Sequence, residues 1–113
     1  MNIAMMLKSG PCTDEAGRAL QTAEDMLAQG HTVTLYLLQE AVRFCQPRAE
    51  CSNTSKLQAL IAKDLKVRVL TPDAVLRGID VSAADPPLTE GSYEALVDLM
   101  TSCDQVVGYL FTG

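Results

Sequence analysis

Aromatic side chains are scarce in this sequence, which has three Tyr, two Phe and no Trp. A buried core must therefore be built from Leu, Val, Ile, Ala and Met. Basic side chains are also few: nine Lys and Arg stand against fourteen Asp and Glu, for a formal net charge of −5. Because nucleic-acid binding proteins need a basic patch or run, and none is present, we expect no nucleic-acid partner.

Long apolar runs are missing as well. No run approaches the roughly 20 residues that span a bilayer, and the first apolar run has neither a basic segment before it nor a small-residue cleavage site after it. We therefore expect a cytoplasmic protein without a membrane partner. With one His, no C-x-x-C pair and no glycine-rich nucleotide motif, the sequence predicts neither a metal site nor a cofactor.

What remains is an ordinary globular composition. The chain has 113 residues, 48% of them hydrophobic and 20% charged. This length and composition predict one folded domain over residues 1–113.

Strand-like and helix-like patterns alternate along the chain. Apolar or alternating runs predict strands at 3–7, 31–38, 66–70 and 105–111, with a further short extended segment at 79–81. Helices are expected between them: one capped by Thr13 and ended by Gly30, one capped by Ser52, Asn53 or Thr54, a short one with Thr71 as its cap, Pro72 at its first position and Asp73 next, and one capped by Ser92. The last helix should present Tyr93, Leu96, Val97 and Met100 on one face. This order predicts an α/β fold, a three-layer sandwich around a four- to five-stranded, mostly parallel sheet.

Three of the four cysteines fall where such folds place their chemistry, at the carboxyl ends of the strands. Cys12 lies in the loop between the first strand and its helix, where the positive helix end is expected to lower its pKa and favour the thiolate. Cys51 lies before the next helix, and the same argument applies to it. Cys45 and Cys51 could instead form a regulatory disulfide. Cys103 continues an apolar stripe and is expected to pack in the core.

Other polar residues offer weaker candidates. Asp73 and Arg77 at the same edge of the sheet could orient a substrate or pair with a partner, but a surface cap and a solvated charge are the simpler interpretation. His31 begins a strand at the opposite edge, so we expect no catalytic role for it.

Several segments together resemble the DsrE/DsrF-like family of small sulfur-trafficking proteins. These segments are the opening strand together with residues 8–11, then residues 15–20, 28–35, 77–79, 94–99 and 104–107. The resemblance implies a compact parallel α/β sandwich that assembles into trimers or hexamers. It also implies a sulfur-relay protein, a persulfide carrier or sulfurtransferase of sulfur metabolism or tRNA thiolation, whose partners are other sulfur-carrier proteins.

The family's active members carry the persulfide on a cysteine just after the third strand. The corresponding loop here, 70–74, contains no cysteine. We therefore expect a cysteine at the carboxyl ends of the strands, the rim of the sheet, to act as the carrier: Cys12 first and Cys51 second. The alternative is a non-catalytic oligomeric subunit or a module that binds a partner or small ligand.

Overall fold

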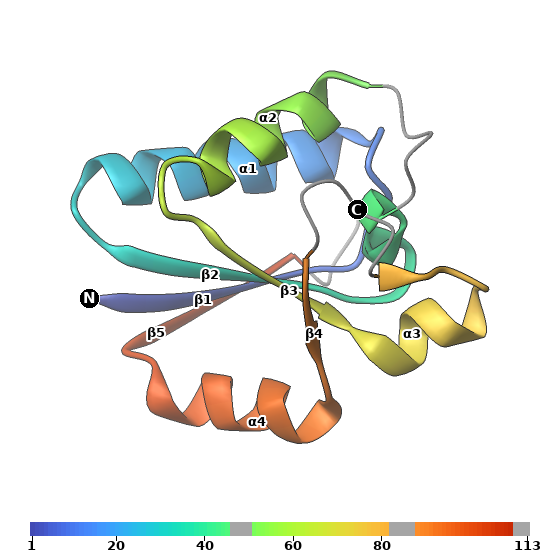
Figure 1. Ribbon diagram of the computed structural model, residues 1–113. Coiled ribbons are helices and arrows are strands. Elements are labelled where there is room, and N and C mark those ends of the chain that lie inside the picture. Colours follow the sequence, from blue (N-terminus) through green and yellow to red (C-terminus); the bar gives the residue numbers. More distant parts are fainter. Residues whose placement is uncertain (46–50, 82–87, 110–113) are drawn as a thin grey trace.

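A five-stranded parallel sheet forms the centre of the computed structural model, which describes residues 1–45, 51–81 and 88–109 (Figure 1). The strand order is β4-β3-β2-β1-β5, and every neighbouring pair is parallel. The strands are β1 (Asn2–Leu7), β2 (Thr32–Leu37), β3 (Lys66–Leu70), β4 (Thr89–Gly91) and β5 (Gln105–Tyr109). The expected α/β class and parallel sheet are confirmed.

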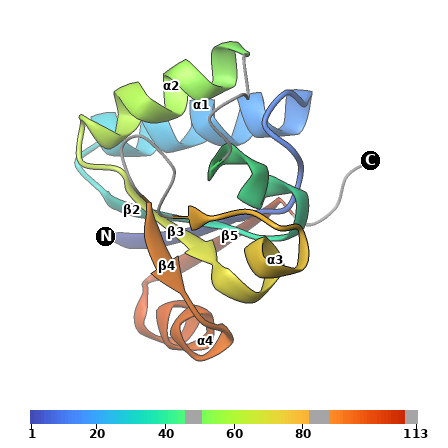
Figure 2. The same ribbon diagram turned by 45° about the vertical axis from the view of Figure 1, so that its right-hand side comes forward.

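Helices cover both faces of the sheet, which gives three layers (Figures 1 and 2). Helices α1 (Asp14–Ala28) and α2 (Ser52–Ile61) lie side by side on one face, and α4 (Tyr93–Ser102) covers the other. The short helix α3 (Thr71–Leu76) and the 3-10 helix η1 (Gln39–Cys45) lie beyond the carboxyl ends of the strands. Among the described residues, no helix is both long and apolar enough to cross a membrane.

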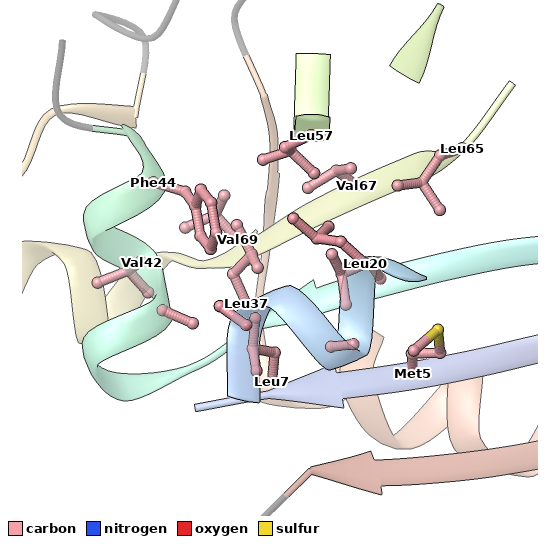
Figure 3. Close-up of a cluster of buried hydrophobic side chains, with 14 of the residues drawn as sticks. Met5, Leu7, Leu20, Leu37, Val42, Phe44, Leu57, Leu65, Val67 and Val69 are labelled. Carbon is pink, nitrogen blue, oxygen red and sulfur yellow. The ribbon is translucent and has the colours of Figure 1, made fainter. Parts of the chain in front are cut away.

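The main core lies between the sheet and the α1–α2 layer (Figure 3). Helix α1 forms here because its apolar residues recur at the helical period and its ends carry matching signals. The Thr13 hydroxyl accepts a hydrogen bond from the Ala16 N–H, and Gly30 follows the helix at φ +88°, a conformation that glycine adopts at little cost. The side chains that fill this core include Met5, Leu7, Leu20, Leu37, Leu57, Val67 and Val69.

A smaller cluster lies under the opposite face, where Met6, Tyr36 and Leu70 are buried against Leu96 and Leu99. The apolar face expected for α4 is therefore wrong in part. Tyr93, Val97 and Met100, which the sequence pattern placed toward the sheet, are exposed by 57%, 56% and 39%. The helix turns its Leu96/Leu99 side to the sheet, and no residue of α4 is fully buried.

Two element boundaries also differ from expectation. Residues 79–81 form no strand; the edge strand β4 begins at Thr89 instead. Helix α3 begins at Thr71, with Leu70 in the capping position. Two expectations fall outside the described residues. They concern the last two residues of the final strand, expected at 105–111, and the Pro-containing segment 83–87.

Candidate functional site

The candidate site lies where β1 and the segment after β2 reach the carboxyl edge of the sheet. Cys12 is fully exposed in the loop between β1 and α1. The Thr13 side chain shapes this loop, because its hydroxyl donates to the Gly10 carbonyl at 2.8 Å and accepts from the Ala16 N–H at 3.2 Å. Cys12 is thereby presented to solvent beside the first turn of α1.

Cys51 occupies the N-cap position of α2, where the sequence pattern led us to expect Ser52, Asn53 or Thr54. Its thiol is partly buried and lies 3.6 Å from the Thr54 hydroxyl. The Cys51 side chain makes no regular capping hydrogen bond to the helix backbone. The expected cap was wrong because those three polar residues already lie within the first turn of the helix.

Asn53 joins the two cysteine-bearing segments. Its side-chain amide donates to the Pro11 carbonyl at 2.8 Å and to the Thr13 carbonyl at 3.1 Å, the residues on either side of Cys12. A residue two positions after Cys51 thus holds the chain on both sides of Cys12. These two hydrogen bonds tie the loop after β1 to the first turn of α2.

The two thiols affect each other's ionisation. A hydrogen bond with Cys12 lowers the pKa of Cys51, and contacts with the Thr54 hydroxyl and with the N–H groups of Thr54 and Asn53 add to this effect. The same contact with Cys51 raises the pKa of Cys12. The expectation of a lowered pKa at Cys12 is therefore wrong, because the interaction with Cys51 raises the pKa of Cys12. Cys51 is the thiol that the site favours as a thiolate.

Both thiols line one hollow of about 500 Å³ between the first turns of α1 and α2. The charged side chains at its wall are Asp14 and Arg18, and the remainder is polar or small. Its residues are Cys12, Thr13, Asp14, Gly17, Arg18, Gln21, Cys51, Ser52 and Asn53.

The remaining cysteines lie apart from this chemistry. Cys45 is buried at the end of η1, and burial raises the pKa of its thiol to about 11. A Cys45–Cys51 disulfide stays a prediction. Cys51 shares its hollow with Cys12, and Cys45 does not line that hollow. Cys103 is half-exposed at the end of α4, where its thiol donates to the Met100 carbonyl, so the core position expected for it is wrong.

The polar candidates at the rim have structural partners. The Asp73 carboxylate accepts from the Gln39 N–H at 2.7 Å, and Arg77 donates to the Asp73 carbonyl and lies 3.5 Å from Glu40. These contacts tie α3 to η1. His31 lies at the opposite edge, where its Nδ1 is 3.3 Å from the terminal amine of Met1.

The segment after β3, where members of the DsrE/DsrF-like family that the sequence resembles carry their cysteine, contains only the start of α3. It borders a second, mainly apolar hollow of about 700 Å³, lined by Thr71, Pro72, Val75, Glu90, Gly91 and Ser92. Within residues 1–45, 51–81 and 88–109, no cluster of three His, Cys, Asp or Glu side chains could bind a metal ion.

The sequence did not predict the contacts of Asn53 or the pairing of the two cysteines. Asn53 was expected only as a helix cap, and nothing local in the sequence indicates its contacts with a loop 40 residues earlier. The pairing of Cys12 with Cys51 had a signal: both were expected at the carboxyl ends of the strands of a parallel sheet, and the structure places the two strands side by side.

Comparison with known proteins shows the fold. No family model matches the sequence, and no curated protein matches it. The crystal structure of the ychN protein from E. coli is similar over 96% of this chain and 99% of its own, with a TM-score of 0.85 and 21% identity. A conserved protein of unknown function from Bacteroides thetaiotaomicron, BT1422, is similar over 95% of this chain and 93% of its own, with a TM-score of 0.78 and 7% identity. At these identities the likeness shows the fold alone.

Proposed function

We propose that this protein is a sulfur-relay protein in which Cys51 carries a persulfide, with Cys12 beside it. The observation that supports the proposal is the meeting of the two rim cysteines in one hollow, with Cys51 favoured as a thiolate at the start of α2. The thiolate is the nucleophilic form of cysteine. The preference between the two residues is thus reversed from the one drawn from the sequence, while both remain in the site.

The reaction needs no cofactor. The Cys51 thiolate attacks the outer sulfur of a donor persulfide, a new S–S bond forms, and the donor leaves as its thiolate. A second exchange of the same kind passes the outer sulfur to the thiolate of an acceptor protein. Because the hollow is open and Cys12 is fully exposed, cysteine-bearing loops of other sulfur carriers can approach.

The test is to load the reduced protein with a sulfane-sulfur donor and locate the adduct by mass spectrometry. We expect a gain of about 32 Da, one sulfur atom, on the peptide that contains Cys51. Cys51→Ser should abolish the adduct, and Cys103→Ser, a matched change at the half-exposed cysteine outside the site, should keep it. If neither the wild-type protein nor Cys12→Ser gains sulfur while an established carrier does, the proposal fails.

A second candidate function is a non-catalytic oligomeric subunit or binding module. Two observations favour it: the loop after β3 has no cysteine and borders an apolar hollow, and α4 exposes Tyr93, Val97 and Met100. In this case a Cys12→Ser/Cys51→Ser double variant should keep the oligomeric size of the protein and support wild-type growth in its host. Loss of growth by a variant of unchanged size would contradict this candidate.

A further inference from the structure

Cys12 and Cys51 are far apart in sequence but share a single exposed hollow. The Cys12 and Cys51 side chains both line this hollow, and the interaction between the two thiols lowers the pKa of Cys51 and raises the pKa of Cys12. Of the four cysteines, Cys12 is the fully exposed one. A free thiol in this position can react with any modified form of its neighbour.

Both segments that carry these cysteines are fixed in place by the fold. The Asn53 amide bonds the carbonyls of Pro11 and Thr13, and Thr13 is itself fixed as the cap of α1. Cys51 in turn is fixed by its place at the start of α2. Holding two reacting groups in this way converts a bimolecular encounter into a much faster intramolecular one.

We propose that Cys12 is a resolving thiol, which displaces the leaving group from a modified Cys51 and forms a Cys12–Cys51 disulfide, and that Asn53 positions the two residues for this step. For a persulfide on Cys51 the proposal rests on the function proposed above. For a sulfenic acid on Cys51 it stands without that function.

In the persulfide case, deprotonated Cys12 attacks the inner sulfur, which is the Sγ atom of Cys51. The Cys12–Cys51 bond forms, the bond between Sγ and the outer sulfur breaks, and the outer sulfur leaves with its bonding electron pair as hydrosulfide. Water in the open hollow takes the proton of Cys12. The sulfane sulfur is reduced by two electrons, the two thiols are oxidised to the disulfide, and no other reactant is needed.

In the oxidative case, a peroxide is the oxidant. The Cys51 thiolate attacks one peroxide oxygen, which gives a sulfenic acid on Cys51 and one water or hydroxide. Cys12 then attacks the Cys51 sulfur, the S–O bond breaks, and the oxygen leaves as water after taking up the proton. A dithiol reductant returns the disulfide to the two thiols.

Cys45 is a poor competitor for this role. It is 1% exposed, whereas Cys12 is open to solvent beside Cys51. For a relay, this step limits the lifetime of the persulfide on Cys51. Sulfur that is not passed on is released as hydrosulfide, and the two cysteines form a disulfide.

The first experiment treats the reduced protein with equimolar hydrogen peroxide and maps the products by differential alkylation and mass spectrometry. We expect a Cys12–Cys51 disulfide in the wild-type protein and in the Cys45→Ser and Cys103→Ser controls. In Cys12→Ser, Cys51 should accumulate as a sulfenic acid that a dimedone probe traps. A wild-type product without this disulfide, or equal dimedone labelling of wild type and Cys12→Ser, would overturn the proposal.

The second experiment tests Asn53 as the positioning residue. In Asn53→Ala we expect disulfide closure to slow about tenfold or more, because the Cys12 loop loses both of its bonds to α2, while the rate of the first oxidation at Cys51 stays near the wild-type value. Asn2→Ala, at the opposite edge of the sheet, is the matched control and should change neither rate. An Asn53→Ala protein that closes at the wild-type rate would remove Asn53 from the proposal.

Failure of this inference can be told apart from failure of the proposed function. A protein that never takes sulfur from a persulfide donor but closes to the disulfide with peroxide refutes the relay and supports the resolving thiol. A protein that takes up sulfur and keeps it equally long in wild type and Cys12→Ser supports the relay and refutes the resolving thiol.

Discussion

At the scale of single residues, Cys51 stands in a position that helices usually give to Ser, Thr, Asp or Asn. Sulfur makes a weaker cap than oxygen, and Cys51 makes no capping hydrogen bond. What the position provides instead is the positive end of a helix and the Thr54 hydroxyl, 3.6 Å from the sulfur, both of which favour the thiolate. The residue that is poor for the helix is therefore suitable for nucleophilic chemistry.

The ionisation of Cys51 can be tested through its partner. Because the hydrogen bond with Cys12 is the largest cause of the lowered pKa, Cys12→Ala should move the pKa of Cys51 upward, and Cys12→Ser, which keeps a donor, should move it less. The measurement is the rate of iodoacetamide alkylation at Cys51 against pH. In the wild type the rate should be half-maximal below the ordinary thiol value of about 8.5, since a lowered pKa leaves more thiolate at neutral pH. Identical profiles for Cys12→Ala and wild type would contradict the contact.

Gly91 is the second residue for which the structure predicts a clear effect of mutation, here on stability. A Cβ atom placed there would lie 2.0 Å from the Tyr36 hydroxyl, which donates to the Ser92 carbonyl at 2.8 Å. Gly91→Ala should therefore lower the free energy of unfolding by about 1–3 kcal/mol, the usual cost of overpacking a core. Gly10→Ala, where nothing lies within 4 Å, is the control. Urea unfolding curves of the two variants decide the point, and equal midpoints would argue against the close approach of Tyr36.

At the scale of elements, the helix starts differ in their caps. Helices α1 and α4 are capped by Thr13 and Ser92, whose hydroxyls accept from the Ala16 and Ala95 N–H groups, while the N-cap of α2 is Cys51. Cys51→Ser should thus raise the free energy of unfolding by about 0.5–1 kcal/mol while it abolishes thiol chemistry, and Ser92→Ala should lower it by about 1 kcal/mol. Urea titration measures both. A destabilised Cys51→Ser protein would show that the sulfur itself packs favourably.

Elements with their own local signals could be predicted from the sequence. Strand β3 has the expected bounds, and α1 has the expected cap and stop, because alternation, helical period and capping residues act within a few positions. Strand β4 could not be predicted. Its three residues show no alternation, and its place next to β3 depends on the absence of a side chain at Gly91. In α4, two overlapping apolar stripes were available, and only packing on Tyr36 and Leu70 selects the Leu96/Leu99 side.

At the scale of the whole molecule, the parallel topology brings the site together. Strand order and direction place the ends of β1 and β2 side by side, so the rim position of Cys12 and Cys51 followed from the expected fold. Their contact did not follow, because it depends on the Asn53 amide reaching across from α2 to the loop after β1. A tertiary hydrogen bond of this kind leaves no periodic trace in a sequence.

The whole molecule also presents an apolar surface on α4, where Tyr93, Val97 and Met100 are exposed. Exposed apolar groups gathered on one face are typical of interaction surfaces, and the family resemblance implies trimers or hexamers. We therefore expect Val97→Lys to lower the oligomeric state, because a buried unpaired charge at an interface is costly. Light scattering after size-exclusion chromatography gives the molar mass. Ala28→Lys, an equal change at an exposed position of α1, should leave the mass unchanged; a wild-type protein that is monomeric at the same concentration would show that this face has another partner or none.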